Sequence, residues 1–335
     1  MTPIVLGLDI GGANLKAATA DKRAVSVPFA LWKQPDRLPA ALADLADQFP
    51  DATEFAVTMT GELCDCFETK RQGVNAILDA VEFAAKGRFV RVWSTDGKFI
   101  DVEQSRRDHL KVAAANWHAL ATFAGRYAPE GGGLLIDIGS TTTDIIPLND
   151  GFPRTRGLTD WKRLETNELV YIGMTRTPVC ALSTVDTCAE LFATTHDINI
   201  VLGLLPEQPG NCDSADGRPL TREYSLARLA RMMGGDRDVL TDDAIHHFAE
   251  CVVNTIVGRV AQSVWEAYFE KKDRPNLRVL ITSGMGEFQI DAIMSRLSHC
   301  MNLERVVSLN EILGPTVSAC APAYALAILA TECQS

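Results

Sequence analysis

The sequence lacks any block of basic residues. Its 335 residues include 32 Lys and Arg against 43 Asp and Glu, which gives a formal net charge of −11. Nucleic acids and anionic membranes attract proteins through clustered positive charge, so neither is an expected partner. An anionic small molecule would have to be held locally, by backbone N–H groups, a metal ion and a few Lys or Arg side chains.

Cysteine pairs and long apolar runs are also missing. The nine cysteines are scattered and form no CxxC pair, and Cys64 and Cys66 alone make a poor zinc site, so we expect free, reduced thiols. No stretch reaches the roughly 18 uninterrupted apolar residues of a membrane helix. The first strand is expected almost at Met1, without the charged and apolar regions of a signal peptide. These absences predict a cytoplasmic protein.

The sequence does contain a polar turn between two apolar strands, at residues 134–146 (LLIDIGSTTTDII). Gly139 supplies the backbone freedom that a tight turn needs. Because this glycine has no Cβ, backbone N–H groups and the hydroxyls of Ser140, Thr141 and Thr142 can approach phosphate oxygens closely. The turn is therefore a candidate phosphate site.

The same pattern occurs near the N-terminus, at residues 6–17 (LGLDIGGANLKA). Here Gly11, Gly12 and Asn14 occupy the turn, and Lys16 follows it. Two ordinary hairpins with glycine turns are the alternative interpretation. Each copy opens one half of the chain and carries polar turn residues, which favours two related halves that offer phosphate turns to a shared cleft.

Three carboxylates accompany the two turns. Asp9 precedes the first turn, and Asp137 and Asp144 bracket the second. Carboxylate oxygens at such positions can hold Mg²⁺ directly or through water. Arg154 and Arg156 follow the second hairpin; their forked side chains suit diphosphate oxygens, and exposed surface charge is the equal alternative.

A polar loop follows the short strand expected at residues 55–59. It contains three acids, two bases and two thiols, and its acids include Glu62 and Asp65. In α/β sheets the loops beyond the carboxyl ends of strands line the ligand site. A solvated connection into the helix expected at residues 73–86 is the alternative.

Taken in order, these motifs resemble the actin-like ATPase superfamily, which includes sugar kinases, heat-shock chaperones and actin. The resemblance implies an α/β fold with two ribonuclease-H-like domains around a central cleft. We expect the first domain at residues 1–130, completed by a C-terminal helix at 320–335, and the second at 131–319. The late Ser-Gly-Met-Gly loop would correspond to the adenosine loop, but it lacks the adjacent glycines usual there, so ATP binding stays open. The resemblance implies a cofactor-binding set of Gly11, Gly12, Asn14, Gly139, Ser140, Thr141, Thr142, Ser283, Gly284 and Gly286.

Three further motifs resemble a narrower family, the hydantoinase/oxoprolinase-like proteins called tetrahydromethanopterin-linked one-carbon-transfer pathway proteins. The motifs are residues 58–70 (TMTGELCDCFETK), 115–117 (ANW) and 192–195 (FATT). This resemblance implies a transferase of methanofuran-type cofactor biosynthesis. Such an enzyme couples an aminomethyl-furanmethanol diphosphate to the phenol of a tyramine or tyrosine derivative and releases diphosphate. The expected partners are these two small molecules, and whether the chain forms a homodimer stays open.

The residues suit that chemistry in definite roles. We expect Asp9 and Asp144 to hold Mg²⁺ with support from Asp137. Lys16 and the turn amides would bind diphosphate. A phenol with a pKa near ~10 needs a base unless the carbocation is reactive enough alone, and Glu62 or Asp65 would receive the phenolic proton or the substrate amine.

Two other functions are compatible with the same fold. The first is an ATP-dependent small-molecule kinase or hydrolase, which requires a working adenine pocket. The second is a non-enzymatic actin-like ATPase or scaffold, although nothing in the sequence indicates a peptide-binding domain or a disordered tail. ATP binding and ADP formation would identify the first, and nucleotide-dependent sedimentation would identify a filament.

Overall fold

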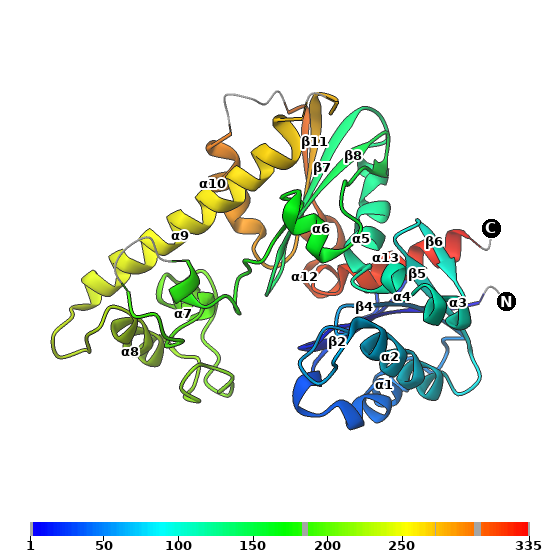
Figure 1. Cartoon of the computed structure of the whole chain (residues 1–335), viewed down its shortest axis with the longest axis horizontal. Helices are drawn as coiled ribbons and strands as arrows, with labels where there is room; N and C mark the ends of the chain where they lie inside the picture. Colours follow the sequence, from blue (N-terminus) through cyan, green and yellow to red (C-terminus); the bar gives the residue numbers. More distant parts are fainter. Residues whose placement is uncertain (1–2, 183–186, 272, 298–302, 334–335) are drawn as a thin grey trace.

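Two mixed β-sheets form the two halves of the chain (Figure 1). The computed structural model describes residues 3–182, 187–271, 273–297 and 303–333. Each half has a six-stranded sheet, ordered β3-β2-β1-β4-β5-β6 in the first and β10-β8-β7-β11-β12, with β9 beside β8, in the second. The strands are β1 Val5–Ile10, β2 Asn14–Thr19, β3 Ala24–Pro28, β4 Glu54–Met59, β5 Phe89–Ser94, β6 Lys98–Ile100, β7 Gly132–Ile138, β8 Thr143–Asn149, β9 Phe152–Pro153, β10 Leu169–Val170, β11 Leu277–Ser283 and β12 Arg305–Ser308.

Both sheets share one pattern of strand directions. In the first, β1 pairs antiparallel with β2 and parallel with β4, and β4 pairs parallel with β5. In the second, β7 pairs antiparallel with β8 and parallel with β11, and β11 pairs parallel with β12. A hairpin continued by parallel strands is the core of the ribonuclease-H-like domain, so the predicted fold class is confirmed.

Helices cover the sheets at the positions that apolar spacing predicts. In α1 (Leu38–Ala46) the buried residues Leu38, Leu42 and Leu45 recur at helical spacing and face the core. The hydroxyl of Thr69 caps α2 (Lys70–Ala85) by accepting from the Gln72 amide at 3.2 Å. The remaining α-helices are α3 Val102–Arg107, α4 His109–Val112, α5 Asn116–Ala124, α6 Asp160–Glu165, α7 Thr195–Val201, α8 Arg222–Met232, α9 Asp242–Val264, α10 Ile290–Ser295, α11 Leu309–Leu313, α12 Pro315–Ser318 and α13 Ala321–Glu332.

The last helix, α13, lies against the first sheet rather than the second (Figure 1). Its alanine-rich surface lets the helix backbone approach β1 closely, because alanine side chains are short. A Cβ placed on Gly7 of β1 would lie 1.9 Å from the carbonyl oxygen of Ala323 in α13. The fold thus brings the C-terminal segment back to the N-terminal sheet, while the expected domain boundaries at residues 130 and 320 stay predictions.

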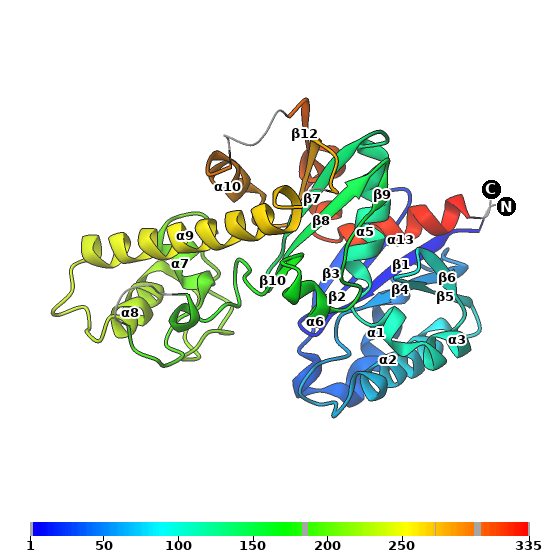
Figure 2. The same cartoon turned by 45° about the horizontal axis from the view of Figure 1, so that its top comes forward.

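A helical lobe extends from the second half. Helix α9 runs outward from β11, and α7 and α8 pack at its outer end (Figures 1 and 2). A buried ion pair fixes this lobe: Arg228 of α8 lies 2.7 Å from Asp197 of α7 and 2.9 Å from Asp216. Across the described ranges, every helix is too short or too polar to span a bilayer.

We predict that Gly7→Ala destabilises the protein, because the new methyl group would collide with the backbone of α13. The free energy of unfolding should fall by about 2 kcal/mol or more. Urea unfolding measures the change. Gly210→Ala is the matched control, since a Cβ at Gly210 meets nothing within 4 Å, and it should shift stability by no more than about 0.5 kcal/mol. Equal stability of both variants would contradict the close packing of α13 on β1.

Candidate active site

The two polar turns are built alike. The Gly11 amide donates to the Asn14 carbonyl at 3.0 Å, and the Gly139 amide donates to the Thr142 carbonyl at 2.9 Å. In each hairpin an aspartate is the penultimate residue of the first strand and faces the second strand: Asp9 faces Lys16, and Asp137 faces Asp144. The repeat predicted from sequence is therefore a structural repeat, and it places Lys16 and Asp144 in equivalent positions.

The repeat extends to a third strand in each half. Asp9 is paired with Thr58 of β4, and Asp137 with Ser283 of β11. Beyond these strands the Gly61 amide donates to Ile10 at 3.1 Å, and the Gly286 amide donates to Ile138 at 3.0 Å. The residue after each of these glycines is a glutamate, so Glu62 and Glu287 occupy matching positions. Sequence reasoning singled out Glu62 and missed Glu287.

Close packing against the turns explains the late glycines. Gly284 has φ +89°, and a Cβ there would lie 2.4 Å from the Ile138 carbonyl oxygen and 2.6 Å from Asp137 Oδ1. A Cβ on Gly286 would lie 2.3 Å from the Ile138 side chain. These two glycines are needed for the loop to pack on the second hairpin, whatever ligand binds. The assignment of Ser283, Gly284 and Gly286 to a nucleotide stays a prediction.

Three carboxylates meet between the two turns. Burial raises the pKa of Asp9, and the nearby Lys16 opposes that shift. Burial and the negative charge of Asp144 raise the pKa of Asp137 to about 7, with Lys16 and Asp9 also acting on it. Asp137 of the second half thus lies within electrostatic reach of Asp9 and Lys16 of the first half, and Asp144 faces it on the neighbouring strand. The assignment of these residues to a metal ion and to diphosphate stays a prediction.

A buried arginine that the sequence did not reveal accompanies Asp144. Arg163 of α6 is 1% exposed, and its Nη1 lies 2.8 Å from Asp144 Oδ1. Burial raises the pKa of Asp144, and the positive charge of Arg163 opposes the rise. The guanidinium carbon of Arg163 lies 4.1 Å from the ring centre of Trp117 in α5. Trp117 belongs to the 115–117 motif, but only the fold shows that its ring supports this arginine.

Glu62 and Asp65 have different surroundings. Glu62 is buried, and its Oε1 lies 3.5 Å from Lys70 Nζ; Lys70 in turn lies 3.4 Å from Asp160 of α6. Burial raises the pKa of Glu62 to about 7 against the opposing charge of Lys70. Asp65 is exposed. The Glu62–Lys70–Asp160 chain joins the two halves beside the turns.

Several oxygens around the turns are buried without a hydrogen-bond partner in the described part of the chain: Asp9 Oδ1, Thr58 Oγ1 and Glu62 Oε2. Buried polar atoms are nearly always satisfied, so this cluster indicates a bound polar ligand, ion or water. No three His, Cys, Asp or Glu side chains of the described ranges are grouped as a metal site. The donors suit Mg²⁺, which is commonly held by one or two carboxylates together with substrate phosphates.

Two sequence-predicted candidates lie elsewhere. Arg156 forms an ion pair with Asp273 at 3.1 Å, and its amide donates to the Glu168 carboxylate at 2.8 Å. Arg154 is exposed beside β9, which pairs with the far end of β8. Of the two interpretations of these arginines, the structure favours exposed surface charge, because the chain after β8 carries them to the surface.

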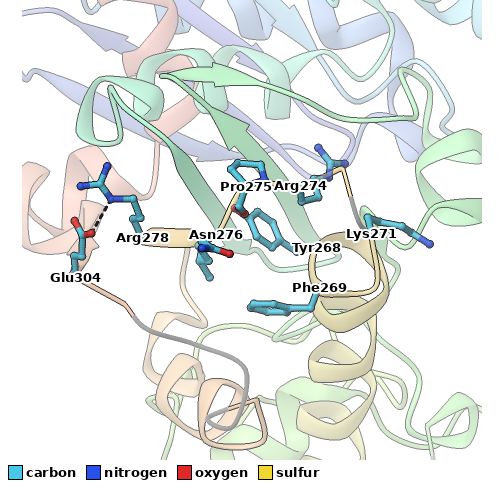
Figure 3. A pocket seen from close by; sticks show the side chains of 9 residues that line it. Tyr268, Phe269, Lys271, Arg274, Pro275, Asn276, Arg278 and Glu304 are labelled. Atoms are coloured by element: carbon cyan, nitrogen blue, oxygen red, sulfur yellow. Dashed lines mark hydrogen bonds and ion pairs between the residues drawn. The ribbon is translucent and has the colours of Figure 1, made fainter.

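A separate pocket of about 460 Å³ lies at the opposite end of the second sheet (Figure 3). Its lining residue Leu277 pairs with Gly132 at the start of β7, whereas Asp137 lies at the end of that strand. An ion pair between Arg278 and Glu304, 2.7 Å apart, forms part of its wall. The pocket is therefore distinct from the site between the turns.

Comparison with known proteins places the chain in a family. Residues 54–332 match the model described as Hydantoinase/oxoprolinase. The chain belongs to the hydantoinase/oxoprolinase family. This family member is 33% identical, over 341 residues, to a Methanocaldococcus jannaschii protein named (4-{4-[2-(gamma-L-glutamylamino)ethyl]phenoxymethyl}furan-2-yl)methanamine synthase, and the alignment covers 98% of each chain.

Two more distant matches agree with this placement. A Methanococcus vannielii protein of the same name is 31% identical over 204 residues. This alignment covers 58% of the present chain and 89% of the relative. Among solved structures, nucleotide-free acetone carboxylase matches with a TM-score of 0.57 at 12% identity, covering 98% of this chain and 70% of that one. This last similarity concerns the fold alone.

We predict that Asp137→Asn stabilises the metal-free protein, more at pH 8 than at pH 5. The pKa of Asp137 is about 7 in the folded protein, whereas the ordinary value is 3.8. The ionised carboxylate therefore lowers the free energy of unfolding above pH 7, and this loss of stability becomes smaller as the pH falls. The gain at pH 8 should be on the order of 1–3 kcal/mol, allowing for partial exposure of the side chain.

Urea unfolding in the presence of a chelator, at both pH values, measures this difference. Asp65→Asn is the matched control, because Asp65 is exposed, and it should change stability little at either pH. A gain for Asp137→Asn that does not depend on pH would contradict the electrostatic account.

Proposed function

We propose that this protein is a transferase that joins a furfuryl diphosphate to a phenol and releases diphosphate. The observation that carries the proposal is the match, over 98% of both chains, to a protein whose name describes a phenoxymethyl-furan product. Such a product contains an ether between a phenol oxygen and a furfuryl carbon. The substrates in this proposal are an aminomethyl-furanmethanol diphosphate and the phenol of a tyramine or tyrosine derivative.

The reaction breaks one C–O bond and forms another. The bond between the furfuryl carbon and diphosphate breaks, and both electrons leave with diphosphate. The furan oxygen stabilises the resulting carbocation. The phenol oxygen then supplies an electron pair for the new ether bond, and the phenolic proton must pass to a base. The protein therefore needs donors for a departing polyanionic diphosphate and one proton acceptor.

The two turns and Lys16 are the proposed diphosphate donors. Turn amides and the hydroxyls of Ser140 and Thr141 are fixed by the hairpins before substrate binds, so little reorganisation is needed as charge develops on the leaving oxygen. Asp9, Asp137 and Asp144 would hold Mg²⁺. Bound there, the ion would supply positive charge to the diphosphate.

Glu62 is the proposed proton acceptor. Its carboxylate is buried, its Oε2 has no partner among the described residues, and its pKa is about 7. A base with a pKa near neutrality is partly ionised at neutral pH and binds a proton strongly enough to assist the phenol. Asp65 is exposed and does not share these features.

We predict that the wild-type protein releases diphosphate from the furfuryl diphosphate in the presence of Mg²⁺, and that release depends on an added tyramine derivative. Mass spectrometry should detect an ether product equimolar with diphosphate, and a chelator should lower the rate. Release of ADP from ATP and a candidate alcohol, without diphosphate release from the furfuryl compound, would instead identify a kinase.

We predict a turnover number that rises with pH through a midpoint near 7, because Glu62 must be ionised to accept the proton. Glu62→Gln should lower turnover by roughly 10²- to 10⁴-fold. Lys70→Met should move the rising limb to higher pH, since Lys70 lowers the pKa of Glu62. Asp65→Asn is the control, and an equal loss in that variant would reverse the assignment of the base.

A further inference from the structure

One arginine connects the two polar turns across the junction of the halves. The Arg176 amide donates to the Ser140 carbonyl at 3.1 Å, so the arginine backbone is fixed against the second turn. The Arg176 guanidinium carbon lies 4.9 Å from the ring centre of Trp32. Trp32 follows Leu31, whose amide donates to the Gly12 carbonyl of the first turn at 2.9 Å. Each partner of this contact is therefore anchored at one of the turns.

The charge of Arg176 has no carboxylate partner in the part of the chain that the structure describes. The site's other arginine, Arg163, is paired with Asp144, and Arg156 is paired with Asp273. The neighbours on which the charge of Arg176 acts are not carboxylates. It lowers the pKa values of Cys64 and Tyr171, although burial raises both values by more. An unpaired guanidinium beside two turns of N–H and O–H donors favours an anion.

Stacking on an aromatic ring leaves the N–H groups of a guanidinium available. A guanidinium has five N–H donors in its plane, and contact through its face leaves the edges free for a bidentate contact with phosphate. Trp32 is half-buried, and Lys33 Nζ also lies 5.8 Å from its ring centre. The ring thus holds the arginine, and Lys33 adds positive charge near the first turn.

We propose that Arg176 is a catalytic residue that binds the leaving diphosphate, and that Trp32 is the positioning residue that holds its guanidinium between the turns. The inference rests on the proposed function, because diphosphate is the anion released in that reaction. A ligand with two phosphoryl groups suits a site with two phosphate turns, and Arg176 is attached to one turn while its side chain lies against the other half. The arginine then opposes the charge that develops on the oxygen of the breaking C–O bond.

The test measures binding of inorganic diphosphate in the presence of Mg²⁺ by titration calorimetry. Arg176→Ala should weaken binding by on the order of 10- to 100-fold, since a hydrogen bond to a charged group is lost. Arg176→Lys should recover part of the loss, because it restores charge without the fork. Trp32→Ala should weaken binding less than Arg176→Ala, and Trp32→Phe should remain close to wild type because a ring face is retained.

Arg218→Ala is the matched control. Arg218 is also an exposed arginine over an aromatic ring, 5.6 Å from the ring centre of Tyr224, but it lies in the helical lobe. Its removal should leave diphosphate binding unchanged. Circular dichroism and the thermal midpoint of each variant check folding, and Arg176 is exposed, so its truncation should leave both unchanged.

The outcomes separate this inference from the proposed function. Wild-type protein that neither binds diphosphate nor releases it from the furfuryl substrate overturns both. If the wild-type protein binds diphosphate and the Arg176→Ala variant binds it equally well, the inference is overturned and the proposed function is not. An unchanged diphosphate affinity with a raised KM for the phenolic acceptor would assign Arg176 to an acidic group of the acceptor and would also overturn it.

Discussion

Charge compensation at the junction of the two halves is the constraint on which the site depends. Asp9, Asp137 and Asp144 lie at the ends of buried strands, where like charges repel strongly because little water screens them. Lys16 and Arg163 reduce that repulsion from opposite halves. The protein alone leaves Asp137 with a pKa near 7, so a cation at this place has both charge and unsatisfied oxygens to bind. The carboxylates that would bind a cation therefore destabilise the folded protein when no cation is present.

The sequence predicted the features that are determined locally. A strand, an Asp-Ile-Gly turn and a second strand specify a hairpin through short-range turn chemistry, and the fold class followed from two such hairpins. Glu62 could be selected because the polar loop that contains it directly follows a strand. Thr58 and Ser283 occupy the same position of the parallel strand in their two sheets, and this match can be seen only when the register is known.

The sequence could not predict contacts that depend on how the halves meet. The contacts Arg163–Trp117, Lys70–Asp160 and Arg176–Trp32 join segments that are far apart in the chain, and no periodicity connects them. The choice between the two interpretations of Arg154 and Arg156 could not be made from the sequence for the same reason. Nearness to a hairpin in sequence does not give nearness to its turn, because the chain leaves β8 at the other end. The proposed substrate, in turn, rests on similarity to a relative and on no single residue.

Lys16 and Asp144 occupy matching positions in the two hairpins, and this difference between the halves has an evolutionary consequence. A duplicated unit that assembled as a symmetric pair would have to present the same side chain twice, so both edges of its shared site would be either basic or acidic. Fusion of the two copies into one chain removes that restriction, and each copy can then change alone. Here one copy has a lysine and the other an aspartate at the same place. The two edges of the site therefore differ chemically, which a symmetric pair of identical units could not achieve.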